Sequence, residues 1–284
     1  MDGGLADRPN GVFRVDATAL AILSLAASGE PHESLEHGRA RLKLEQGADG
    51  RVWVSRRHPA SYWPTPLAIL AWQNSPSSEI AQGRAVQFLL GTTGNHFSPK
   101  PDAPWAHDTS LKGWPWIEET HSWVEPTAMG VMALRATGYA QHERAKEAVR
   151  MLIDRQLPHG GWNSGNTLIF GKELHPNAEG TGSALASLAG QVEQAVVSRS
   201  LEYLQGEVAR LRTPISLGWA LLGLAAWAQY PSNGIALVDL CLARQPRYGE
   251  YETSALCLLF LGALAGESTV RHPLLAYSDS IPPV

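Results

Sequence analysis

The chain has 284 residues, and 44% of them are apolar, which is enough for a sizeable hydrophobic core and excludes a mainly disordered protein. The charges nearly balance, with 23 Lys and Arg against 27 Asp and Glu, so no overall basic surface for nucleic acid is expected. Two cysteines without a CxxC pair indicate no disulfide framework, and the first residues lack a leader pattern, so we expect a cytoplasmic protein.

Short apolar segments recur along the chain. Four clear copies carry a Thr close to the start of a run of Ala, Leu, Ile and Gly, and two weaker copies follow. Because these runs are apolar on nearly every side, they predict helices that are buried all round. The six segments are residues 16–25, 63–72, 125–134, 179–188, 215–222 and 253–260.

Segments of mixed charge alternate with the apolar ones. In residues 141–156 the apolar positions recur every three or four residues, which is typical of an amphipathic helix. Buried helices alternating with amphipathic ones predict an all-α fold, an α/α toroid (α6–α6 barrel) of six helix pairs. We expect one toroid domain over residues 14–265, with tails at 1–13 and 266–284. The amphipathic segments are residues 33–46, 78–90, 141–156, 192–209 and 234–244.

A second motif follows three of the amphipathic segments. It consists of Gln, three residues, Gly, and then an aromatic residue, as in Gln156, Gly160 and Trp162. The glycine suits a left-handed turn at a helix end, and the aromatic ring can pack on the next helix pair. The other copies are Gln46, Gly50 and Trp53, and Gln245, Gly249 and Tyr251.

Taken together, these two motifs resemble those of the terpene-cyclase and protein-prenyltransferase superfamily (prenyltransferase and squalene oxidase repeat proteins), whose fold is an α6–α6 barrel. The resemblance covers residues 14–265. It implies an isoprenoid or similar apolar substrate, and it leaves the reaction to be argued from the site residues.

Class II cyclases carry an Asp-x-Asp-Asp-Thr-Ala motif whose middle Asp is a proton donor. The resemblance places Glu179 at that position, but Asn177 and Gly180 replace the flanking Asp residues, so the full motif is absent. We take Glu179 as the candidate acid, with His175 four residues earlier as its hydrogen-bond partner.

Acidic residues occupy the same slot in two other repeats, at Asp16 and Glu125. A carboxylate at a helix start can cap backbone N–H groups, and the helix N-terminus then lowers its pKa. Capping is therefore the favoured interpretation of Asp16 and Glu125, and proton donation by Glu125 is the alternative.

The stretch from residue 91 to 124 is the longest connection, and we expect it to fold over an opening of the ring. Together with two other loops it predicts an aromatic, substrate-binding pocket; inter-repeat packing is the alternative role for the same rings. The residues concerned are Trp53, Tyr62, Trp63, Trp114, Trp116, Trp123, Trp162 and His121.

Metal ligands are not expected. Asp239 and Cys241 have a zinc-like spacing, but they fall in an amphipathic helix without a nearby His, so Cys241 is interpreted as a packed core residue. His107 and Asp108 in the long loop could supply metal ligands or an acid/base pair, but a solvated rim is the favoured interpretation because no ligand spacing there is diagnostic. No phosphate-binding loop is present, and no cofactor is predicted.

Two functions follow from these observations. The first is a cyclase-like enzyme that binds an apolar, isoprenoid-like small molecule and starts the reaction by protonation. The second is a barrel that binds a lipid or a protein partner without catalysis, or one subunit of a prenyltransferase-like complex. An added subunit would close a pocket that a lone barrel leaves open on one side.

Overall fold

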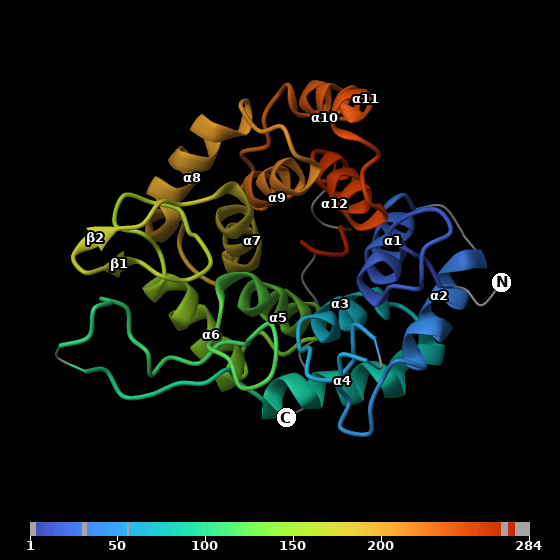
Figure 1. The fold of residues 1–284 in the computed structure, drawn as a ribbon, viewed down its shortest axis with the longest axis horizontal. Helices are drawn as coiled ribbons and strands as arrows, with labels where there is room; N and C mark the ends of the chain where they lie inside the picture. Colours follow the sequence, from blue (N-terminus) through green and yellow to red (C-terminus); the bar gives the residue numbers. More distant parts are fainter. Residues whose placement is uncertain (1–3, 30–32, 56, 101, 268–271, 276–284) are drawn as a thin grey trace.

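Six apolar helices form the inner wall of a ring (Figure 1). The computed structural model describes residues 4–29, 33–55, 57–100, 102–267 and 272–275. Each inner helix packs against the next, and α12 returns to pack against α1, so the ring is closed. The inner helices are α1 (Val15–Ala27), α3 (Pro64–Ala71), α5 (Val124–Ala136), α7 (Ala178–Leu188), α9 (Pro214–Ala225) and α12 (Thr253–Leu264). The predicted all-α toroid is confirmed.

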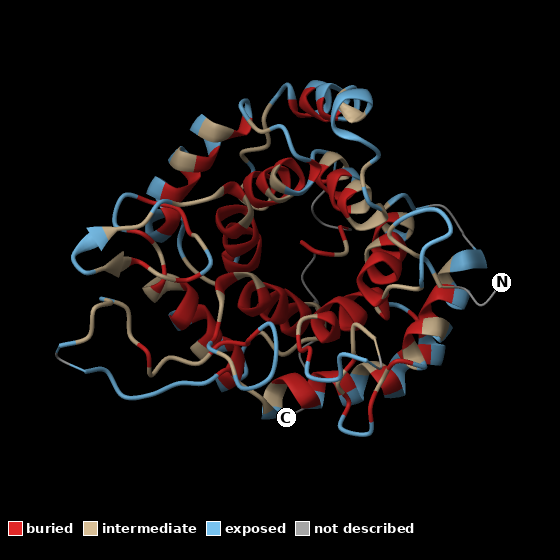
Figure 2. Cartoon of the chain, in the orientation of Figure 1, coloured by how far each residue is buried: buried red, intermediate tan, exposed pale blue. Residues whose placement is uncertain are grey.

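A second layer of helices covers the ring from outside. Figure 2 shows the inner helices buried on nearly all sides, while the outer helices expose the face that points away from the ring. The outer helices are α2 (Glu33–Lys43), α4 (Glu79–Gly91), α6 (Glu143–Asp154), α8 (Gln194–Val208) and α10 (Gly234–Leu242). Within the described ranges no outer helix follows α12, so the last of the six expected pairs is represented by its inner helix alone.

Four short elements complete the described part of the chain. A 3-10 turn (Pro76–Ser78) leads into α4, and α11 (Gln245–Tyr248) follows α10. Between α6 and α7, strands β1 (Leu168–Ile169) and β2 (Lys172–Glu173) form an antiparallel hairpin. None of the helices in the described part of the chain has the length and apolar character needed to cross a bilayer.

Buried threonines fix the start of four of the six inner helices, α1, α3, α5 and α7. The hydroxyl of Thr127 accepts a hydrogen bond from the backbone N–H of Trp114 at 2.9 Å and lies 3.4 Å from the carbonyl oxygen of the same residue. The same arrangement joins Thr18 to Leu5, Thr65 to Val52 and Thr181 to Trp162. These contacts explain the recurrent Thr: each one ties the segment that enters an inner helix to the first turn of that helix.

The first ten described residues take part in this framework. Besides the bond from Leu5 to Thr18, the hydroxyl of Thr253 at the start of α12 donates to the backbone carbonyl of Ala6 at 2.8 Å. The segment therefore joins the first and last inner helices on one face of the ring.

Glycines bring neighbouring inner helices close together. A Cβ atom on Gly182 of α7 would lie 2.2 Å from the carbonyl oxygen of Trp219 in α9, and one on Gly218 would lie 2.7 Å from that of Leu258 in α12. Because real Cβ atoms do not approach so closely, these two helix contacts require glycine. Part of the high glycine content thus lies in the inner wall as well as in the turns.

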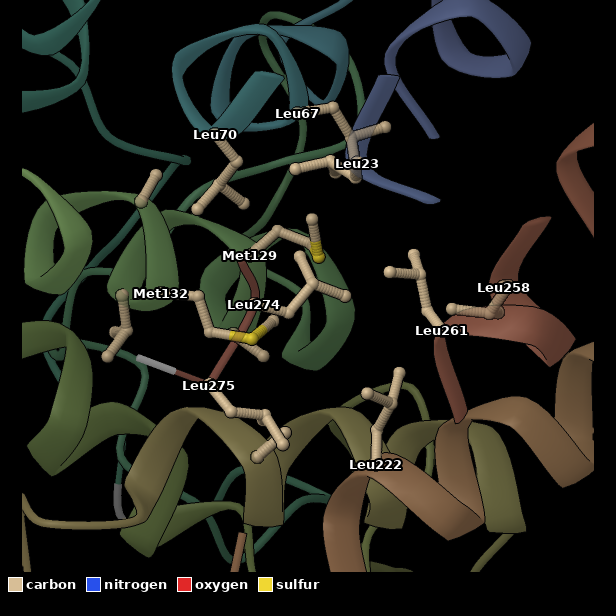
Figure 3. Close-up of a cluster of buried hydrophobic side chains, with 14 of the residues drawn as sticks. Leu23, Leu67, Leu70, Met129, Met132, Leu222, Leu258, Leu261, Leu274 and Leu275 are labelled. Carbon is tan, nitrogen blue, oxygen red and sulfur yellow. The ribbon is translucent and has the colours of Figure 1, made fainter. Parts of the chain in front are cut away.

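Residues 272–275 lie inside the ring and close one of its ends (Figures 1 and 3). Leu274 and Leu275 are 1% and 3% exposed and lie among apolar side chains of the inner helices, including Met129 and Met132. Arg135, in the last turn of α5, donates to the Leu274 carbonyl at 2.9 Å. This four-residue segment, which we call the floor, therefore closes the ring near the C-terminal ends of the inner helices.

The imidazole of His272 is part of the floor. Its Nε2 lies 3.0 Å from the backbone carbonyl of Leu261, and burial lowers the pKa of His272 to about 4. His272 is therefore neutral at physiological pH, as its apolar surroundings require.

The threonine contacts predict a specific stability effect. Thr127→Val keeps the side-chain volume but leaves the buried N–H of Trp114 without its partner, so unfolding should become easier by about 1–3 kcal/mol. Thr92→Val is the matched control, because its half-buried hydroxyl bonds only a carbonyl of its own helix, Phe88. Chemical denaturation of both variants measures the difference, and equal losses would contradict the role given to Thr127.

The floor predicts a second effect. Leu274→Ala removes a fully buried side chain from the ring centre and should reduce the free energy of unfolding by about 2–5 kcal/mol. Leu240→Ala, on the outer helix α10, should change it little because Leu240 is 58% exposed. Thermal or chemical unfolding curves provide the measurement; a Leu274 variant as stable as the Leu240 variant would show that the floor does not contribute.

Candidate active site

Two carboxylates meet where the inner helices begin. Glu125 lies in the first turn of α5 and Glu179 in the first turn of α7, and these helices pack side by side. The Glu179 carboxylate accepts a hydrogen bond of 2.6 Å from the Ser216 hydroxyl, which lies in the first turn of α9. Three neighbouring inner helices therefore contribute one polar side chain each to the same face of the ring.

The electrostatics of this cluster distinguish the two acids. Burial raises the pKa of Glu125, and the negative charge of nearby Glu179 raises it further. Both effects favour a proton on Glu125. The Glu179 carboxylate is held by the Ser216 hydroxyl.

The expected capping roles are not found. The residue at the N-cap position is Trp123 for α5 and Arg14 for α1, and neither helix start has a side-chain cap bond. Glu125 instead takes part in the acid cluster, and Asp16 is bound by the Arg14 guanidinium at 2.7 and 2.9 Å. The expectation that the helix N-terminus lowers the pKa of Glu125 is therefore wrong, because burial and the second acid outweigh the helix dipole.

His175 lies apart from the acid cluster. Its side chain is exposed, and its backbone carbonyl accepts a bond from the Asn163 side chain. The α7 cap is Asn177, whose side chain accepts from the Gly180 N–H at 2.7 Å. Among the described residues Ser216, rather than His175, is the hydrogen-bond partner of Glu179.

The predicted aromatic residues do not line one pocket. Trp114 and Trp162 are 1% and 0% exposed, and each indole N–H donates to a carbonyl in an outer helix, that of Leu89 in α4 and that of Leu152 in α6. These two rings are therefore packed between the layers, where no ligand can reach them in this conformation. For Trp114 and Trp162 the inter-repeat packing alternative holds.

The other predicted rings lie near the same face but in different places. Trp63 and Trp116 form an edge-to-face pair with ring centroids 5.9 Å apart, and Trp116 is 36% exposed. Tyr62 is buried against Phe88 with centroids 5.1 Å apart, under the Arg51 guanidinium. Trp53 lies against Gly47 in its turn.

His121 and Trp123 line a separate cavity of about 140 Å³ beneath the long loop, together with Phe97, Trp105 and His107. This cavity, called the rim cavity below, also borders the loop that precedes α7. Sequence analysis did not assign Phe97 to any site, because its approach to Trp105 and His121 depends on how the loop folds.

The described residues contain no group of three or more His, Cys, Asp or Glu side chains placed to hold a metal ion. Cys241 is 2% exposed and packs in the core as expected, with Sγ 3.5 Å from the Arg212 carbonyl. Asp108 accepts hydrogen bonds from Ser110, and its neighbour His107 lines the rim cavity. Among the described contacts no hydrogen bond joins His107 to Asp108, so the two do not form a hydrogen-bonded acid/base pair.

Sequence reasoning missed Ser216 because its partner is 37 residues away on another helix. A signal was present, because Ser216 and Glu179 both lie in the first turn of a repeated apolar helix. The sequence alone does not show which first-turn side chains of different repeats meet.

Comparison with known proteins identifies the fold. No protein-family model and no curated protein sequence match this chain. The solved structures that resemble it include the type II terpene cyclase MstE from Scytonema in its apo form, with 13% sequence identity and a TM-score of 0.62 over 94% of this chain and 94% of that chain. A variant of MstE in complex with its substrate geranylgeranyl dihydroxybenzoate has 12% identity and a TM-score of 0.61, over 94% and 93%.

A further match is ent-copalyl diphosphate synthase from Streptomyces platensis, with 17% identity and a TM-score of 0.57; it covers 89% of this chain and 50% of that chain. At these identities the likeness concerns the fold. The chain therefore has the terpene-cyclase-like fold that the repeats predicted.

The raised pKa of Glu125 predicts a pH-dependent stability. A carboxyl group whose pKa is raised by folding stabilises the protein below its unfolded pKa, and this contribution is lost as the pH rises through the folded value. Glu125→Gln should therefore be more favourable to stability at pH 7–8 than at pH 4, relative to the parent protein. Chemical denaturation across this pH range measures it.

The matched control is Glu79→Gln, which changes an exposed acid in the first turn of α4 and should leave the pH profile as it is. A Glu125 variant whose stability differs from the parent by the same amount at every pH would show that Glu125 has its ordinary pKa.

Proposed function

We propose that this protein is a terpene-cyclase-like enzyme that protonates an isoprenoid or similar apolar chain at the face of the ring where the inner helices begin. The observation that carries the proposal is the pair of carboxylates, Glu125 and Glu179, on adjacent inner helices, with the pKa of Glu125 raised by burial and by Glu179. Paired acids in different surroundings are a common means of keeping one carboxyl group protonated near neutral pH.

In the proposed step Glu125 is the acid. Its carboxyl proton is transferred to one carbon of an alkene, the π electrons form the new C–H bond, and the neighbouring carbon becomes a carbocation. Glu125 is left as a carboxylate beside Glu179. The π electrons of a second alkene of the same chain then form a C–C bond to this carbocation, which closes a ring and moves the positive charge to another carbon. Loss of a proton from the cyclised cation to the Glu125 carboxylate forms the product alkene and restores the acid, so no co-reactant is consumed.

The surroundings of the acid pair support this chemistry. Trp219 lies three residues after Ser216 on α9, hence on the same helix face, and it is partly exposed. An aromatic face at this position can stabilise positive charge along the chain. At the other end of the ring the floor supplies the apolar side chains of Leu274 and Leu275, which lie near Met129 of α5.

The substrate class is inferred from the apolar wall and from the fold. MstE, which shares the fold, has been crystallised with an isoprenoid chain attached to a dihydroxybenzoate. By analogy a prenyl chain of this kind is the first substrate to test here, with its terminal alkene at Glu125.

The test is turnover of defined substrates. The protein is incubated with squalene and with farnesyl, geranylgeranyl and geranylfarnesyl compounds, including geranylgeranyl dihydroxybenzoate, and the products are identified by mass spectrometry. Glu125→Gln should lower kcat by about 10²–10⁴-fold, which is the usual contribution of a positioned acid. Ser216→Ala should shift the alkaline limb of the pH profile, where activity falls as Glu125 loses its proton, because Ser216 binds the neighbouring Glu179 carboxylate.

The matched control is Glu119→Gln, which removes an exposed carboxylate of the long loop and should leave kcat unchanged. If no substrate is converted, or if Glu125→Gln and Glu179→Gln turn over as the parent does, the protonation proposal is wrong. Binding of these lipids without turnover would then favour the non-catalytic barrel, and activity that appears only with an added subunit would favour the prenyltransferase-like complex.

A further inference from the structure

The outer layer of the ring is incomplete beside α12. Three of the outer helices span two successive inner ones: α4 packs against α3 and α5, α8 against α7 and α9, and α10 against α9 and α12. By the same rule a sixth outer helix would lie between α12 and α1, but none of the described residues forms one (Figure 1). We call the uncovered outer side of α12 and α1, between α10 and α2, the open sector.

The face of α12 in the open sector is apolar. Leu258 and Leu261 lie on the side of α12 that faces the ring centre (Figure 3), so the spacing of the helix places Leu256 and Phe260 on the outer side. Phe260 is 44% exposed and Leu256 is half-buried. From Thr253 to Leu264 the helix contains no charged residue. A helix that is apolar on every side is suited to being covered on every side, and in the described part of the chain this face is uncovered.

A groove of about 370 Å³ lies beside α12 in the open sector, between α1 and α2. Its α2 edge carries the exposed side chains of Glu33 and His37. The open sector thus combines an apolar surface with an edge that bears one carboxylate and one imidazole. The apolar residues that line the groove are Leu5, Ala21, Ile22 and Leu25.

The outer helix α10 has an apolar outward face of its own. Ile235 and Leu242 are 52% and 37% exposed, and their spacing places them with Asp239 on one face of the helix. Leu240 lies on another side of α10 and is not part of this face. The exposed positions of α6, by contrast, are all charged: Glu143, Lys146 and Arg150.

α10 matches the open sector in length as well as in apolar character. Its nine residues span about 13 Å and the twelve residues of α12 about 18 Å, so α10 fits along α12. Because α10 packs against α12, the two features are neighbours on one chain. Two copies related by a two-fold axis can therefore each place α10 on the open sector of the other, and the pair of contacts closes on itself.

Charges at the edge of the groove favour one direction for this helix. Glu33 and His37 are one turn apart on α2, about 6 Å along the helix, and Asp239 and Arg244 are about 7.5 Å apart along α10 and its C-terminal extension. With α10 antiparallel to α2, Asp239 lies beside His37 and Arg244 lies beside Glu33. In the opposite direction Asp239 would approach Glu33, so the complementary charges select the antiparallel arrangement.

We propose that this chain forms a two-fold symmetric dimer in which α10 of each copy occupies the open sector of the other. Ile235 and Leu242 cover the groove and Phe260, and Arg244 pairs with Glu33 across the interface. The partner is thus a second copy of this chain. The interface does not include the acid pair, and the proposal does not depend on the proposed reaction.

The mass of the protein in solution is the first test. Sedimentation equilibrium and light scattering at micromolar concentrations should give twice the 30.7 kDa of one chain. Ile235→Glu and Phe260→Glu should each raise the Kd of the dimer at least about tenfold, because each change places two carboxylates in an apolar contact. The matched control is Ile80→Glu on α4, where Ile80 is 83% exposed outside the open sector, and it should leave the Kd unchanged.

A charge exchange tests the orientation of the two copies. Glu33→Arg and Arg244→Glu should each weaken the dimer several-fold, because each places two like charges side by side. The double variant that carries both changes restores the opposite charges and should recover the parent Kd to within about threefold. Circular dichroism establishes that every variant is folded, so a general loss of structure is not mistaken for dissociation.

Several results would overturn the proposal. These are a monomeric parent protein, a dimer that Ile235→Glu and Phe260→Glu weaken no more than Ile80→Glu does, and a double charge variant that stays as weak as the single ones. A monomer that binds phosphatidylglycerol vesicles through Ile235 and Phe260 would assign the open sector to a lipid surface instead. None of these outcomes depends on whether the protein turns over an isoprenoid.

Discussion

The hydroxyl group of a buried threonine at the start of an inner helix is the contact on which the ring depends. It holds the incoming segment at a constant separation of 13 residues for Thr18, Thr65 and Thr127. At Thr181 the separation is 19 residues, because the β1–β2 hairpin lies inside the connection. In the connection to α5, most of the long loop lies before the tied residue Trp114. Loops on this face can therefore vary in length without changing how the helices meet.

This constraint explains where the candidate sites lie. The loops that the threonines leave free are on the face where the inner helices begin, and the acid pair and the rim cavity are both found there. The first turns of the inner helices supply the acid pair, and the loops supply the aromatic side chains that line the rim cavity. At the opposite end the ring is closed by residues of its own chain, among them Leu274 and Leu275.

The helices could be predicted from sequence because each inner segment is apolar all round and each outer one is amphipathic, which are local properties. The site was predicted less well, because it depends on contacts between distant residues. Glu179 was predicted as a candidate from its slot in the repeat, but its hydrogen-bond partner Ser216 is on another helix. Trp114 and Trp162 have the composition of a binding pocket, yet only the bonds to Leu89 and Leu152 show that they belong to the packing between layers.

The floor has a consequence for the order in which the protein assembles. Residues 272–275 come after every ring helix in the chain, and they bind groups on α5 and α12 as well as Gln73, which is 200 residues earlier. Contacts at such separations form late, because a long stretch of chain must first be ordered. A growing chain can therefore complete its wall of helices while the centre is still open to water, and the last described residues then enter from the C-terminal end and seal it.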